Sequence, residues 1–205
     1  MKASMALTAL VLAASVTAAA AWTTTFTMHN LCPYPVWPLV TPNAGLPAIA
    51  GGANIRLDSN GLASLAFPAA AAWSGRVVPR TGCSDAARCA TGDAPPATVA
   101  QVSVNAAAGL AEYSVSLVDG FNVPATITPH AFDASQTCPV LGCAVDLNAV
   151  CPADARVGGG AGCMASPQFF KERCPEERTT ATDVEATPQR CFGPGELKVV
   201  FCPTN

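Results

Sequence analysis

The chain has 205 residues, of which 50% are hydrophobic and 12% are charged, and its formal net charge is −3. A chain this apolar is not a disordered polar one, and its length suits one domain of ordinary size. The acidic balance, with no run of Lys and Arg, argues against nucleic acid as a partner. Ten cysteines are unusual in a reducing cytosol and ordinary in an oxidising compartment.

The first 21 residues have the pattern of a secretory signal peptide. Lys2 supplies an early positive charge, Met5–Val16 is a short apolar run, and small residues precede an expected cleavage before Trp22. The run is shorter than the roughly 20 apolar residues of a membrane helix. We therefore expect a mature chain, residues 22–205, that is secreted to the extracellular space and has no membrane anchor.

Short segments of alternating polar and apolar residues predict strands in the mature chain. They are rich in Thr, Val, Tyr and Phe and are separated by Gly and Pro, as in sheets with one buried face. The clearest segments are residues 23–28, 54–58, 100–105, 113–117 and 196–201. Their spacing favours an all-β sandwich or barrel.

One short helix is predicted just after Ser166. Serine is a good N-cap and Pro167 suits the first helical position, while Cys174-Pro175 ends the helix within about two turns. The helix lies in a loop-rich stretch, residues 138–191, that is dense in cysteine. We expect this stretch to form a small second lobe beside the sheets.

The cysteines predict a disulfide framework, since an even number in a secreted chain is typical of disulfides, although spacing alone leaves the pairing open. A zinc site is the alternative. The sequence has no C-x-x-C pair, and His29 and His130 are isolated, so we expect neither a metal nor a cofactor. A serine hydrolase is also disfavoured, because there is no G-x-S-x-G motif.

Ordered blocks across residues 22–205 resemble the thaumatin-like proteins of plants, a pathogenesis-related family. The blocks that carry the resemblance are Phe26–Cys32 with Val36-Trp37, Gly75–Cys83, Cys89–Asp93, Asp119–Pro124, Cys138–Pro152, Phe169–Pro175 and Val200–Pro203. The resemblance implies a flattened two-sheet β-sandwich with a disulfide-rich second lobe and one short helix.

The cysteine count relates the chain to the short form of that family. Six cysteines of the long members are missing, and Ala94 stands at one of their positions. The resemblance therefore implies a reduced second lobe. It also implies the five disulfides Cys32–Cys202, Cys83–Cys89, Cys138–Cys191, Cys143–Cys174 and Cys151–Cys163.

The resemblance further implies a cleft, which family members build from one Arg, one Glu and three Asp residues. The acidic positions fall here, in chain order, on Gln101, Ala111, Ser114 and a residue near Asp183, and the Arg has no match. Glu112 reaches the cleft only after a register shift of one residue, which in a strand turns a side chain to the opposite face. Glycoside hydrolysis needs two carboxylates. We therefore expect no catalytic residue, and take Gln101, Glu112, Ser114 and Asp183 as candidate cleft positions.

Three functions follow from the resemblance. The first is a plant defence protein of the apoplast, a monomer that acts against fungi by binding cell-wall glucan without catalysis. The second is an inhibitor of a microbial xylanase or other glycoside hydrolase, with His130 on a loop that enters an acidic hydrolase cleft when protonated. The third is a weak β-1,3-glucanase.

Overall fold

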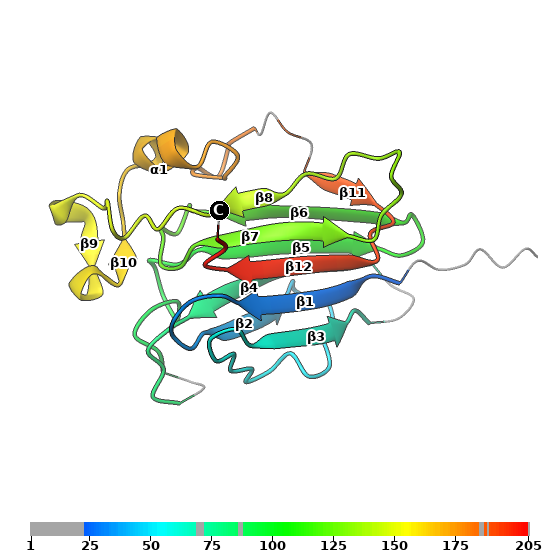
Figure 1. The fold of residues 1–205 in the computed structure, drawn as a ribbon, viewed down its shortest axis with the longest axis horizontal. Coiled ribbons are helices and arrows are strands. Elements are labelled where there is room, and N and C mark those ends of the chain that lie inside the picture. The colour runs from blue at the N-terminus through cyan, green and yellow to red at the C-terminus, as the bar shows by residue number, and fades with distance from the viewer. Residues whose placement is uncertain (1–22, 69–71, 86–87, 185–186, 188, 205) are drawn as a thin grey trace, which may run out of the picture.

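The computed structural model describes residues 23–68, 72–85, 88–184, 187 and 189–204, so the expected signal peptide lies outside the described residues. Two five-stranded sheets form the body of the molecule and lie as two layers (Figure 1). The first has the order β3-β1-β12-β7-β8, made of β1 (Thr25–Asn30), β3 (Leu62–Ala66), β7 (Ala125–His130), β8 (Leu141–Cys143) and β12 (Glu196–Phe201). The second has the order β11-β6-β5-β4-β2, made of β2 (Trp37–Pro42), β4 (Trp73–Arg80), β5 (Val99–Asn105), β6 (Leu110–Ser116) and β11 (Arg190–Phe192). The predicted all-β sandwich is confirmed.

The first and last strands of the described chain are neighbours in the first sheet. Strands β1 and β12 are parallel neighbours, paired from Thr25↔Glu196 to Asn30↔Phe201, and the other neighbours in the two sheets are antiparallel. Just beyond this pair, the Cys32–Cys202 disulfide links residues 170 apart in sequence.

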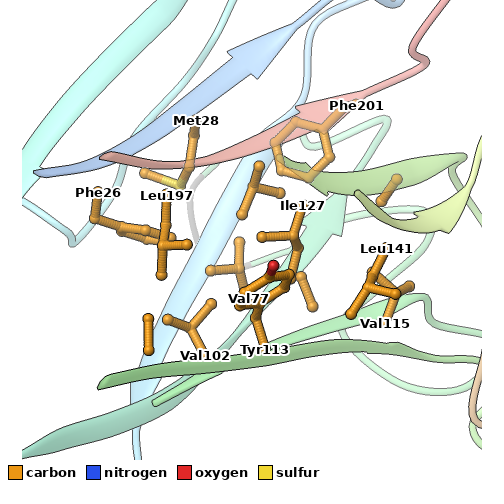
Figure 2. Packing of buried hydrophobic residues seen from close by; sticks show 14 of the residues in the cluster. Phe26, Met28, Val77, Val102, Tyr113, Val115, Ile127, Leu141, Leu197 and Phe201 are labelled. Carbon is orange, nitrogen blue, oxygen red and sulfur yellow. The ribbon is translucent and has the colours of Figure 1, made fainter. Parts of the chain in front are cut away.

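Apolar side chains from the inner faces of both sheets fill the core. Strand β12 shows the expected period of two, because Leu197, Val199 and Phe201 are fully buried while the residues between them are partly exposed. Figure 2 shows Leu197 and Phe201 of the first sheet facing Val102 and Tyr113 of the second. Burial of these faces supplies the main free energy of folding.

The second lobe is small and is formed by η1 (Ala153–Ala155), β9 (Arg156–Val157), η2 (Gly158–Gly160), β10 (Gly162–Cys163) and α1 (Pro167–Arg173). It lies beside one end of the sandwich (Figure 1). Four cysteines belong to its apolar cluster, together with Leu117, Phe121, Leu147 and Phe170. Disulfides therefore take up part of the interior that larger side chains fill in the sandwich. Strands β8 and β11, at the two ends of the range 138–191, are members of the two sheets.

All ten cysteines are paired in the structure. The pairs are Cys32–Cys202, Cys83–Cys89, Cys138–Cys191, Cys143–Cys174 and Cys151–Cys163. They are the same five pairs that the family resemblance implies.

The predicted helix is confirmed as α1, where Ser166 Oγ accepts a hydrogen bond from the Phe169 N–H at 3.3 Å. The strand predicted at residues 54–58 is wrong. Asn54 has a φ of 57°, and only Leu57 pairs, in a single bridge with Val36. His130 is the last residue of β7, opposite Glu196, and not a loop residue as predicted.

Within the part of the chain that the structure describes, no helix is both long and apolar enough to cross a bilayer.

Candidate functional site

A cleft of about 600 Å³ opens on the outer face of the second sheet. Strands β4, β5 and β6 form its floor, and the end of β2 with the loop that follows forms one wall. The opposite wall comes from the segment that leads into β11. The described lining residues are Thr41, Pro42, Asn43, Ala44, Ser74, Gly75, Arg76, Gln101, Val102, Ser103, Glu112, Tyr113, Ser114, Arg178 and Gln189.

Strand register places polar side chains of the floor in two rows. In the first row, Arg76 lies opposite Gln101, which lies opposite Ser114. Ser114 Oγ donates a hydrogen bond to Gln101 Oε1 at 3.2 Å. Thr41 of β2 extends this row on the other side of Arg76. The row thus presents a guanidinium, an amide and hydroxyl groups.

The second row runs one pleat further along the strands. Ser74 lies opposite Ser103, and Ser103 lies opposite Glu112. Asn43 Nδ2 donates a hydrogen bond to Ser74 Oγ at 2.8 Å, which ties the wall to the floor. On the other side of β6, Glu112 lies opposite Arg190 of β11 in the strand register.

Three of the four candidate positions, Gln101, Glu112 and Ser114, line this cleft together. The expectation that Glu112 needs a register shift is wrong. Glu112 and Ser114 are two residues apart in β6, so their side chains share a face. Ala111 points to the other face and is buried in the core with 1% of its surface exposed, so its assignment to the cleft is wrong too.

Asp183, the fourth candidate position, does not line the cleft. Its carboxylate accepts hydrogen bonds from the Thr179 N–H at 2.7 Å, the Thr179 hydroxyl at 2.9 Å and the Thr180 hydroxyl. These bonds, that from the Thr180 hydroxyl first, hold the pKa of the Asp183 carboxyl well below its usual range. Lys171 Nζ lies 3.5 Å from Asp183 Oδ2. Asp183 thus shapes the loop behind the wall.

The cleft wall is anchored by backbone pairing. The Leu117 N–H donates to the Arg178 carbonyl at 2.7 Å, and the Arg178 N–H donates to the Val115 carbonyl at 3.1 Å. Lys171 Nζ also donates to the Glu177 carbonyl at 2.8 Å, which links α1 to this segment. Arg178 is thereby held beside the end of β6, where it lines the cleft.

Sequence reasoning missed Arg76, Arg178 and Gln189. The position of Arg76 was recognisable, because the buried residues Trp73, Gly75 and Val77 alternate with more exposed ones along β4, and Arg76 is one of the exposed residues. Arg178 and Gln189 have none, since they lie outside named strands and reach the cleft through tertiary pairing.

The charged side chains limit what the cleft does chemically. Of the described lining residues, Glu112 alone carries a carboxylate, against two arginines. The acid–base pair of a glycosidase needs a second carboxylate about 5–10 Å away. The described part of the cleft is therefore suited to hydrogen bonding and charge pairing, and lacks that pair.

Fold and site together define a small disulfide-bonded β-sandwich protein with a polar cleft on one sheet. The family model for the thaumatin family matches residues 30–167, and the chain belongs to this family.

Relatives and a solved structure agree with that assignment. An osmotin-like protein of Solanum lycopersicum is 39% identical over 225 residues, covering 86% of this chain and 87% of the relative. A protein of Prunus avium named glucan endo-1,3-beta-glucosidase is 30% identical over 226 residues, covering 87% and 90%. The solved structure of the thaumatin-like xylanase inhibitor TLXI is 26% identical, with a TM-score of 0.52, and the match covers 87% of this chain and 99% of that chain.

Proposed function

We propose that the protein is a secreted plant defence protein that acts against fungi by binding, without catalysis. Membership of the thaumatin family and the similarity to an osmotin-like protein support the defence role. Five disulfides suit the oxidising space outside the cell, where such bonds persist. The proposed partner is a glycan of the fungal cell wall, with glucan as the first class to test.

One observation carries the non-catalytic part of the proposal. Gln101 stands at the centre of the cleft floor, where it accepts a hydrogen bond from Ser114. An amide neither donates a proton to a leaving group nor takes one from water as a carboxyl group does. Glu112 is the single carboxylate among the described lining residues, and it lacks there the second carboxylate that either hydrolytic geometry requires.

The test combines binding and growth measurements. Purified protein is incubated with insoluble fungal cell wall, the bound fraction is measured, and growth of the same fungus is followed. The proposal predicts that the protein binds the wall and slows growth. Protein that stays in solution and leaves growth unchanged contradicts it.

A second candidate function is inhibition of a microbial xylanase or other glycoside hydrolase. The similarity to TLXI favours it, since the match spans nearly all of that inhibitor. A rigid disulfide-bonded scaffold suits an inhibitor, because little conformational entropy is lost on binding. Inhibition of a fungal xylanase by the purified protein, without binding to the wall, would replace the first proposal with this one.

A third candidate, weak β-1,3-glucanase activity, is suggested by the name of the Prunus avium relative. The composition of the cleft argues against it here, for the reason given for Gln101 and Glu112. Release of reducing sugar from a soluble β-1,3-glucan is the direct assay.

A further inference from the structure

We infer that the cleft takes an anionic glycan, one whose sugars carry carboxylate or phosphate groups, in preference to a neutral glucan. The inference rests on the proposed function, because it names the ligand class of the same cleft.

The charge of the cleft is the first reason. The whole chain has a formal net charge of −3, yet the described lining residues include two arginines and a single carboxylate. Arg76 is exposed on the cleft floor, on β4 and beside the wall that β2 forms. A guanidinium forms two parallel hydrogen bonds with a carboxylate or phosphate, and these charge-assisted bonds are stronger than bonds to neutral hydroxyls.

The second reason is that the described lining residues offer no exposed aromatic surface. A neutral sugar ring presents an apolar face that packs well on an aromatic side chain. Among the described lining residues Tyr113 is the only aromatic one. Its ring is in the core, 2% of the residue is exposed, and its hydroxyl donates to the Pro139 carbonyl at 2.7 Å. Ligand selection therefore depends on charge and hydrogen bonding.

The third reason is the arrangement of the charges. Arg76 and Glu112 lie on β4 and β6, with β5 between them, and the axes of the two strands are about 10 Å apart. No ion pair joins the two side chains among those found in the described chain. Hydroxyl and amide groups of Gln101, Ser103 and Ser114 lie between. The cleft is thus polarised. An anion is favoured at Arg76, and sugar hydroxyls, which donate to the carboxylate, are favoured at Glu112.

The test compares four oligosaccharides of equal length by titration calorimetry. They are an oligogalacturonate, its neutral methyl ester, an oligomannose that carries phosphate, and a β-1,3-glucan oligomer. We expect at least one acidic ligand to bind about tenfold or more tightly than both neutral ones, with an affinity that falls as salt rises. Binding of the oligogalacturonate would identify carboxylate as the charged group, and binding of the phosphorylated oligomannose would identify phosphate.

Two matched variants assign the effect to the cleft. Arg76→Gln removes the exposed guanidinium of the floor and is expected to lower the affinity for the acidic ligand roughly tenfold to a hundredfold. Arg88→Gln removes the same charge from a side chain that is 81% exposed and lies outside the lining, and is expected to change nothing. Equal binding of acidic and neutral ligands, or equal affinity of the two variants, overturns the inference.

The outcome separates this inference from the proposed function. If the protein binds fungal wall and slows growth while Arg76→Gln behaves as the native protein does, the function stands and the inference fails. If an acidic oligosaccharide binds in an Arg76-dependent way and the wall assays are negative, the inference stands and the defence proposal fails.

Discussion

The two faces of the second sheet differ in burial and in chemistry, although both come from the same strands. On β6 the inner face carries Tyr113 and Val115, which are buried in the core. The outer face of the same strand carries Glu112 and Ser114, which line the cleft. The residues of the inner face are constrained by close packing, and they maintain the fold. On the outer face, substitutions can alter the chemistry of the cleft without loss of the sandwich. A family fold and a family activity are therefore separate properties of this sheet.

The largest expected loss of stability comes from removing a large side chain from the inner face. Tyr113→Ala removes a core ring and leaves the Pro139 carbonyl without its donor, and should lower the free energy of unfolding by about 3–5 kcal/mol. Urea denaturation measures the change. Glu112→Ala, at the neighbouring position on the outer face, is the control and should stay within about 0.5 kcal/mol of the native protein. Equal losses for both variants would remove the proposed difference between the faces.

A smaller effect is expected at Gly75, where the inner face of β4 has no room for a side chain. An added Cβ would collide with the Trp73 ring and lie 2.6 Å from the Thr41 carbonyl oxygen. Gly75→Ala should therefore cost about 1–3 kcal/mol. Urea denaturation of this variant measures the loss, and Ser103→Ala, on the outer face of β5, is the control. A Gly75→Ala variant as stable as the native protein would show that the Trp73 ring is free to move aside.

A pH-dependent effect is expected from Asp183, which supports the cleft wall. Because folding lowers the pKa of its carboxyl, the stabilisation is complete above the unfolded pKa of about 3.9 and is lost as pH falls below it. Asp183→Asn should lower the melting temperature by a few degrees at pH 7, and the difference from the native protein should shrink towards pH 2. Thermal melts across this range measure it. A difference that is independent of pH would contradict the role of the charged carboxylate.

The smallest change in stability is expected for Arg76→Gln. The side chain is exposed, so the free energy of unfolding should stay within about 0.5 kcal/mol of the native value. Urea denaturation again gives the number. A large loss would mean that Arg76 holds the sheet together and would undermine its use as a binding probe.

Four of the five alternating segments and the capped helix were predictable because each is encoded locally, in a period of two or in Ser166-Pro167. Residues 54–58 alternate as well but form no strand, since Asn54 has a positive φ and only Leu57 pairs. Strands β2, β4 and β7 were harder to predict because each contains proline. Pro38 lies in the edge strand β2, Pro79 extends beyond the segment of β4 that pairs with β5, and Pro129 extends beyond the segment of β7 that pairs with β8. Proline has no N–H to donate, so it is tolerated where a strand has no second neighbour that needs that hydrogen bond. Only the sheet order reveals such places.

The candidate site was predictable in part, for a related reason. Gln101 and Ser114 were found through the family resemblance, and strand pairing does bring them together. Glu112 was assigned to the wrong face because the match placed two cleft residues three positions apart, which a regular strand does not allow. Arg76 and Arg178 were missed because neither stands at the one arginine position of the family pattern, and because they reach the cleft through cross-strand and loop pairing.

We propose that this cleft binds its ligand without cutting it. This proposal is tested most directly by incubating native protein with fungal cell-wall glycan and measuring bound protein and released reducing sugar in the same sample. We expect bound protein with no sugar released above the level of a protein-free control. Sugar release that Glu112→Gln abolishes would contradict it.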